Sequence, residues 1–201
     1  MLKHITTFII LFFVSAINAQ TQDKTLFIGD IFSDTTTFQT RYIDKTFTPL
    51  LKSENKIEIR FISYPAFELS NYLILTYNEE WSVKYYFRDS ETDSLSWTDL
   101  TQKTNIHSVF SLLVSNNIFS LPDHDSLKTV KYEYNTETNQ INGSGTNVFD
   151  GIYYSIEFKV GYMYRRYGYS NPDVFAAFYP YDNQLRNFVN IVDLFNEFLK
   201  D

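Results

Sequence analysis

Strict alternation of apolar and polar side chains limits what this chain can fold into. The pattern runs through residues 57–61, 81–88 and 153–160, where every second side chain is apolar. A period of two is typical of a β-strand with one face against a core. Residues 72–77 form a further apolar run, and only residues 78–80 separate it from the next strand. Because so short a connection joins antiparallel neighbours, the sequence predicts an antiparallel sheet.

Two segments have the spacing of amphipathic helices. Apolar residues recur every three or four positions through residues 106–114 and again through residues 185–199. Thr104 or Asn105 can cap the first helix at its N-terminus, and Asn116 begins its stop signal. Each helix has one apolar face, so we expect both to pack against the sheet.

The order of these elements predicts an α+β fold. Further strands are expected at residues 130–134 and 162–169, whereas residues 90–101 and 139–147 have the composition of polar loops. Residues 119–122 leave the first helix as an extended piece that docks on the core. The prediction is an antiparallel β-sheet of about six strands with two helices packed on one face.

Residues 1–19 have the organisation of an export signal. Lys3 gives a basic start, residues 5–16 are almost wholly apolar, and small residues follow as far as Ala19. The apolar run is shorter than the roughly 20 residues that span a bilayer. We expect cleavage after Ala19, with Ala16 as the alternative site. An uncut anchor and a buried N-terminal helix are the other interpretations, and the flanking residues fit them less well.

Removal of the signal leaves a chain of 182 residues, which suffices for one domain with its own core. It divides into an irregular lead-in, residues 20–55, and a single α+β domain, residues 56–201. The sequence has no cysteine, so it is neither an acylated lipoprotein nor a protein stabilised by disulfides. We expect it in the periplasm or outside the cell.

The charge balance excludes several classes of partner. The formal net charge is −7, and it becomes −8 when Lys3 leaves with the signal. An acidic surface repels nucleic-acid phosphates and anionic membranes, and the sequence contains no strong cluster of Lys and Arg. After the signal, no stretch is apolar for long enough to insert into a membrane.

Few residues of the chain suit nucleophilic or metal chemistry. The only histidines after the signal are His107 and His124, and no Gly-x-Ser-x-Gly motif is present. Residues 123–125 read Asp-His-Asp, the one place where imidazole and carboxylates cluster. Because further ligands at metal-binding spacing are missing, we interpret this segment as a turn and expect neither a metal nor a cofactor.

The most informative polar residue is Glu157, in a strand whose other face is apolar. A two-residue turn at residues 160–161 would place Glu157 opposite Tyr164 and diagonal to Arg166. A three-residue turn would place it opposite Arg165 instead. The candidate ligand- or partner-binding residues are Glu157, Arg165, Arg166, Tyr164, Tyr153 and Asp150. The alternative interpretation is a cross-strand ion pair without a binding role.

Several of these positions also carry a resemblance. Asp150-Gly151 precedes an aromatic strand with Glu157, an Asn-Pro step precedes the terminal helix, and residues 119–122 read Phe-Ser-Leu-Pro. Over residues 56–199 this pattern resembles small exported bacterial domains of uncharacterised function. The resemblance implies an α+β fold and export, and it brings no activity, cofactor or substrate.

These observations favour a binding function. The chain is predicted to be an exported domain that binds a protein partner or a cell-envelope component, with no catalysis evident. A hydrolase of glycan or peptide that uses carboxylates not identified by sequence is one alternative. A purely structural domain of the envelope is the other.

Overall fold

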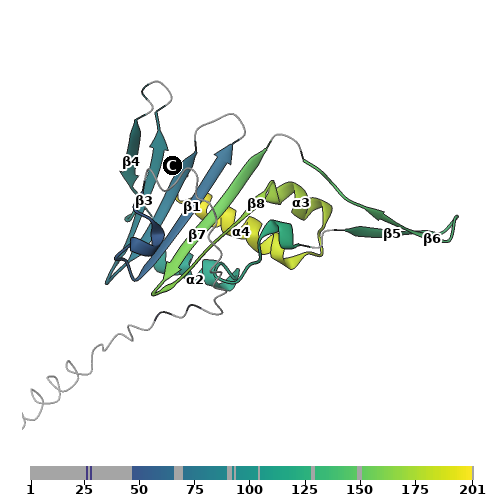
Figure 1. Ribbon diagram of the computed structural model, residues 1–201, viewed down its shortest axis with the longest axis horizontal. Helices are drawn as coiled ribbons and strands as arrows, with labels where there is room; N and C mark the ends of the chain where they lie inside the picture. The colour runs from purple at the N-terminus through teal and green to yellow at the C-terminus, as the bar shows by residue number, and fades with distance from the viewer. Residues whose placement is uncertain are drawn as a thin grey trace, which may run out of the picture.

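The computed structural model describes residues 47–65, 70–89, 94–103, 105–127, 130–148 and 151–200, together with Leu26, Ile28 and Thr92. The expected export signal at residues 1–19 lies outside these described residues. The main body is a six-stranded antiparallel sheet with helices against one of its faces (Figure 1). The predicted α+β class, the antiparallel sheet and the placement of the helices are therefore confirmed.

The strand order of the main sheet is β4-β3-β2-β1-β7-β8. The strands are β1 (Ile57–Pro65), β2 (Asn71–Tyr77), β3 (Trp81–Arg88), β4 (Leu95–Asp99), β7 (Ile152–Val160) and β8 (Met163–Ser170). The first four strands are joined by short connections and lie side by side, and β7 then pairs with the edge that β1 leaves open. This pairing runs from Ile57 opposite Val160 to Pro65 opposite Ile152, so it joins two distant parts of the sequence.

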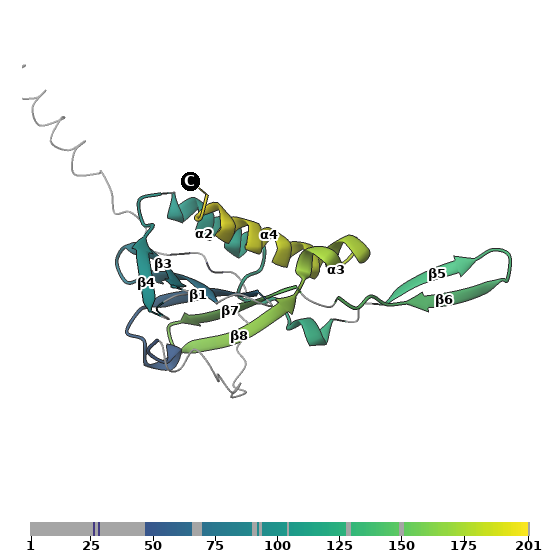
Figure 2. The ribbon, with the colours of Figure 1, turned by 90° about the horizontal axis from the view of Figure 1, so that it is seen from above.

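The helices lie on the same side of the sheet, as the view from above shows (Figure 2). These helices are α2 (Ile106–Ser115), α3 (Pro172–Phe178) and α4 (Asn183–Glu197). The chain also contains two short 3-10 helices outside this layer, η2 (Leu50–Lys52) and η3 (His124–Ser126). Asn105 caps α2 by accepting a hydrogen bond from the Ser108 amide, and Asp182 caps α4 in the same way. The other expected cap, Thr104, lies outside the described residues.

The core fills the space between the helices and the sheet. Alternate strand residues point toward the helices, whose apolar faces supply the other half of the contacts. Phe119 is only 1% exposed and its ring contacts those of Phe110 and Phe158. Residues 119–122 dock on this core as expected. Tyr167 supports them by donating a hydrogen bond of 2.6 Å to the carbonyl of Ile118.

One strand of the main sheet differs from the prediction, although the number six is right. Residues 90–101 were expected to form a loop, but β4 lies within them. The strand expected at 130–134 is β5 (Lys131–Asn135), which is in a separate two-stranded sheet. Its partner is β6 (Gln140–Ser144), which lies within the predicted loop at residues 139–147. Because β4 is short and rich in Ser, Thr and Asp, its composition resembles that of a turn.

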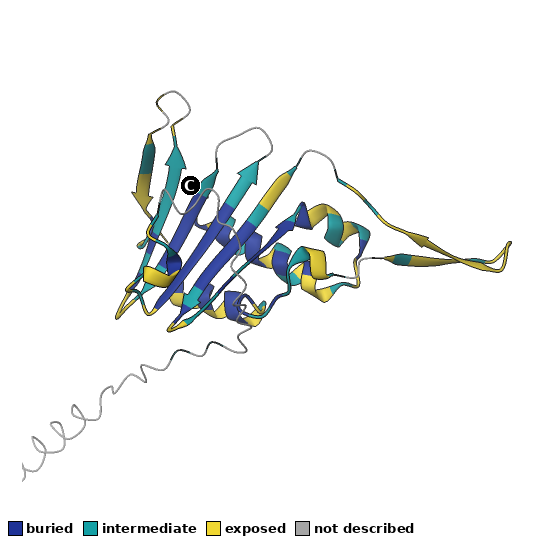
Figure 3. Ribbon diagram, viewed as in Figure 1, coloured by how far each residue is buried: buried dark blue, intermediate teal, exposed yellow. Residues whose placement is uncertain are grey.

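The β5–β6 hairpin forms an arm that projects from the body and is almost entirely exposed (Figure 3). On one face of it, Tyr132, Tyr134 and Ile141 are 71%, 59% and 70% exposed. Its alternation is that of a half-buried strand, which is why sequence alone placed it in the sheet. The base of the arm is tied to the body where the Thr146 amide donates to the hydroxyl of Tyr179, at 3.3 Å.

We expect the body to fold without the arm. Replacement of residues 131–144 by a short glycine-containing turn should change the melting temperature by no more than about 3 °C, since only about 1 kcal/mol of packing is lost. The matched change in the core, Phe119→Ala, should cost about 3–5 kcal/mol and lower the melting temperature by roughly 10 °C. Scanning calorimetry checks both, and unfolding of the armless variant would contradict this account.

Candidate functional site

One face of the main sheet is not covered by α2 and α4, and we call it the open face. It consists of the even-numbered residues of β1, β2, β3 and β8 and the odd-numbered residues of β4 and β7, which alternate with the core positions. Figure 1 views the sheet from this side, with η2 in front of the strands. Polar and charged side chains occupy much of it.

A row of charged side chains crosses the open face. The strand register places Arg60 of β1 opposite Glu157 of β7, and Glu157 opposite Arg166 of β8. Glu157 Oε2 lies 3.8 Å from Arg60 Nη1, and its Oε1 lies 3.7 Å from Arg166 Nη1. Arg60 is 3% exposed and Glu157 is 4% exposed. Charges that are buried to this extent depend on one another, because neither is solvated by bulk water.

Glu58 completes the charge balance around Arg60. Its Oε1 accepts hydrogen bonds from Arg60, with Nε at 2.7 Å and Nη2 at 2.6 Å. Its Oε2 accepts from the hydroxyl of Ser53 and, at 2.8 Å, from the side-chain amide of Asn55. Arg60 Nη2 also donates to the carbonyl of Thr48 at 2.7 Å. Residues before β1 are thus fixed on the open face by the buried ion pair.

These contacts determine the ionisation of Glu58. Burial acts to raise the pKa of its carboxyl group. The hydrogen bond from Ser53, the positive charge of Arg60 and the hydrogen bond from Asn55 outweigh that effect. The net result is a pKa below the ordinary value of 4.5, so Glu58 is an anion at neutral pH.

The register of the β7–β8 hairpin corrects both sequence expectations. Its turn is formed by Gly161 and Tyr162, and Val160 pairs with Met163. Glu157 therefore lies directly opposite Arg166, neither diagonal to it nor opposite Arg165. The physical reason is that Val160 is buried among core residues and stays in the strand, while Gly161 adopts a positive φ of 58° at the turn.

The structure separates the predicted site residues. Glu157, Arg166, Tyr164 and Tyr153 share the open face, whereas Arg165 points to the helix side and donates to the carbonyl of Leu121. Arg165 is buried, so it is not part of this surface. Asp150 lies outside the described residues. Glu157 is too deeply buried to contact a large partner, and its role is to position Arg60 and Arg166.

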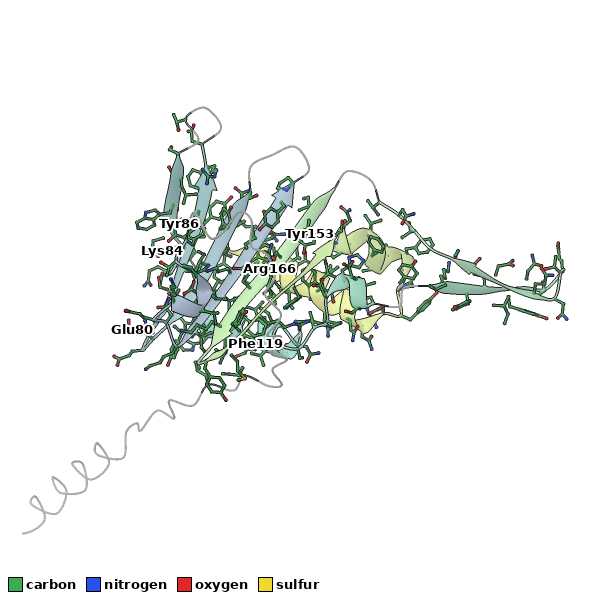
Figure 4. The ribbon with its side chains drawn as sticks, in the orientation of Figure 1. Glu80, Lys84, Tyr86, Phe119, Tyr153 and Arg166 are labelled. Carbon is green, nitrogen blue, oxygen red and sulfur yellow. The ribbon has the colours of Figure 1, made fainter. Side chains whose placement is uncertain are left out.

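Tyr153, Tyr164 and Arg166 are the accessible part of the predicted group, and Figure 4 labels Tyr153 and Arg166. Tyr153 is 38% exposed, and Arg166 donates to the Ser155 hydroxyl at 3.1 Å. A Cβ atom at Gly168 would lie 2.2 Å from the hydroxyl oxygen of Tyr153. Glycine is therefore needed at this position for Tyr153 to lie over β8, and its ring lies 5.9 Å from that of Tyr64.

A cavity of about 550 Å³ lies between the open face and residues 47–55. Its floor comes from β1, β2 and β3 and includes Arg60, Thr76, Ser82 and Lys84. The sequence pattern does not reveal it, because residues 47–55 have the irregular composition of a lead-in. The available signal was the pair of charged residues on the polar side of β1, which require partners when that strand is central.

The Asp-His-Asp segment forms a structural contact. His124 Nδ1 accepts a hydrogen bond of 3.1 Å from the Ser170 amide, and its ring packs edge-on against Phe175. Burial lowers the pKa of His124 against the opposing effect of Asp125 and Asp123. Among the described residues no group of three His, Cys, Asp or Glu side chains could hold a metal ion.

Comparisons with known proteins identify no relative of this chain. No protein family model matches the chain, and neither curated proteins nor solved structures gave a match. The resemblance to small exported bacterial domains therefore stays a prediction. Within the part of the chain that the structure describes, no helix is both long enough and apolar enough to cross a membrane.

Glu58→Gln should lower the free energy of unfolding at pH 7 by about 3 kcal/mol, because it leaves Arg60 with a reduced counter-charge in a buried place. The carboxylate contribution is present above pH 4.5 and is lost as the pH falls through the lower pKa of the folded state. Urea denaturation at pH 7 and pH 3 should therefore show a difference from wild type that shrinks in acid. Glu54→Gln, at an exposed neighbour, is the control, and an equal effect of both variants would refute the claim.

His124 should titrate with a midpoint below 6.5, since its folded form is the neutral imidazole. The stability from its bond to Ser170 is full above pH 6.5 and is lost as the pH falls through the lower folded pKa. An NMR titration, assigned with His107→Gln, follows the imidazole and the Ser170 amide together. A midpoint above 6.5, or an amide signal that does not move, would disprove this role.

Proposed function

We propose that this protein is an exported binding domain that holds an anionic component of the cell envelope against its open face. The observation that carries this is the charge of that face. Its strand positions include five cations and three anions, which gives +2 in a chain whose net charge is −7. The cations are Arg60, Lys84, Arg88, Lys159 and Arg166, and the anions are Glu58, Asp99 and Glu157. Electrostatic complementarity of this kind steers and orients a partner of opposite charge.

The types of residue at the edges of the open face support binding. Tyr, Trp and Arg are enriched where proteins contact partners. Trp97 is 55% exposed on β4, and Tyr153 is exposed on β7 at the other side of the face. The cavity between residues 47–55 and the strands β1, β2 and β3 suits a chain or a ring better than the flat surface of a folded protein. A protein partner is therefore the second outcome of the test below.

The cavity does not suit the hydrolase alternative. A glycosidase or peptidase of the carboxylate type needs a general acid with a raised pKa beside a second carboxylate. The buried carboxylate in the cavity, Glu58, has a lowered pKa, and both of its oxygens accept hydrogen bonds from protein groups. Its role is to hold Arg60, and it is unsuited to proton transfer to a substrate.

The proposal is tested by co-sedimentation of the purified protein with an isolated cell-envelope fraction. The double reversal Lys84→Glu and Arg88→Glu should reduce the bound fraction at least fivefold, and added salt should weaken the binding of wild type. Lys103→Glu with Arg186→Glu is the matched control, because it makes the same charge change at exposed positions away from the open face.

Equal loss of binding in the two double variants would show a nonspecific effect of charge and would overturn the proposal. Retention of binding by the open-face variant would do the same. Loss of binding after protease treatment of the envelope fraction would identify a protein as the partner and would overturn the choice of a non-protein component.

A further inference from the structure

The cavity over β1, β2 and β3 contains hydrogen-bond donors that have no acceptor among the described residues. Lys84 Nζ lies 4.6 Å from the centre of the Trp97 ring and makes no hydrogen bond to any residue in the described ranges. Thr76 and Ser82 face each other across the β2–β3 pairing, and both line the cavity. Their hydroxyl groups likewise have no hydrogen-bond partner within the described chain. An ammonium group and two hydroxyls therefore share the cavity floor: Lys84 and Ser82 are two residues apart on β3, and Thr76 lies opposite Ser82 on β2.

The buried anion of the cavity is already in use. Both oxygens of Glu58 are occupied, by Arg60 on one side and by Ser53 and Asn55 on the other. Asp99, which faces Lys84 from β4, accepts a hydrogen bond of 2.8 Å from the Thr101 amide and lies outside the cavity lining. The donors are thus available while the nearby acceptors are occupied, and this combination favours an anionic ligand.

The charged residues that line the cavity sum to a small net positive charge. The lining contains three cations, Lys52, Arg60 and Lys84, and two anions, Glu54 and Glu58. The charge of Arg60 is balanced by Glu58 and Glu157, so the positive charge nearest to the β3 part of the floor is that of Lys84. A negative group above β3 is attracted by the lining, whereas a positive one is repelled.

Aromatic side chains form one wall of the cavity. The rings of Phe47 and Tyr86 meet edge to face with centroids 5.0 Å apart, and both residues line the cavity. Lys84 and Tyr86 are neighbours on the same face of β3 (Figure 4). Flat apolar surfaces beside a cation and hydroxyl donors match a ligand whose ring carries a charged oxygen group.

Resting on the proposed function, we propose that this cavity binds a small ring-bearing ligand through an anionic oxygen group, either a carboxylate or a phosphate. The ammonium of Lys84 pairs with the anion, and the hydroxyls of Thr76 and Ser82 donate hydrogen bonds to it or to adjacent ring oxygens. Phe47 and Tyr86 contact the ring. In the envelope, such a group occurs as a unit of an acidic polysaccharide, so the cavity would recognise one residue of the component held by the open face.

The test is a titration of the purified protein, followed by NMR, with three sugars that share the glucose ring and differ in the group at carbon 6. Glucuronate carries a carboxylate, glucose 6-phosphate carries a phosphate, and glucose is the neutral control. We expect saturable shifts at Lys84, Ser82 and Tyr86 with at least one anion, and affinity at least tenfold weaker for glucose. Lys84→Met should weaken the affinity for the anion at least tenfold, and Ser82→Ala should weaken it several-fold. Lys103→Met should leave this affinity unchanged.

Equal binding of glucose and both anions, no shifts at these residues, or full binding by Lys84→Met would overturn the proposal. The stronger of the two anions decides between carboxylate and phosphate. Failure here is distinct from failure of the proposed function. If the open-face double variant loses binding to the envelope fraction while no sugar anion binds to the wild type, the proposed function holds and only the proposed ligand class is wrong.

Discussion

The position of Arg60 in the middle of the sheet is the constraint on which the rest of the structure depends. A guanidinium group 3% exposed on a central strand needs counter-charges within reach, and the pairing of β1 with β7 supplies Glu157 while β1 itself supplies Glu58. Ser53 and Asn55 then complete the shell of Glu58. These three buried charges thus join the segment before β1, the strand β1 and the β7–β8 hairpin.

This arrangement divides the charges of the chain in a way that bears on function. The anions of the sheet that lie deepest, Glu58 and Glu157, are committed to Arg60, whereas Lys84 and Arg166 lie farther out. The open face consequently presents positive charge although the protein as a whole is acidic. The same ion pair holds residues 47–55 over the sheet, and these residues form the wall of the cavity. The ion pair that stabilises the fold therefore also positions the wall of the proposed binding site.

Much of the fold follows from local patterns, and the errors have physical reasons. Alternation located β1, β3 and β7, and helical spacing with Asn105 as cap located α2, because each pattern reports burial on one face. Alternation does not say what covers a face, so the arm was placed in the main sheet. The hairpin register depended on whether Val160 belongs to the strand, and that depends on core packing. The cavity escaped prediction because it is made by contacts between residues far apart in sequence.

The most direct test of this account is a double-mutant cycle on Glu58 and Arg60, measured by urea denaturation at pH 7. Each single change, Glu58→Gln or Arg60→Met, leaves one charge buried with less compensation, so each should cost about 3 kcal/mol or more. The double variant removes both charges, and the account expects it to be less destabilised than the sum of the singles by at least about 1 kcal/mol. Losses that simply add would show that the two residues act independently and would contradict the central role given to their pairing.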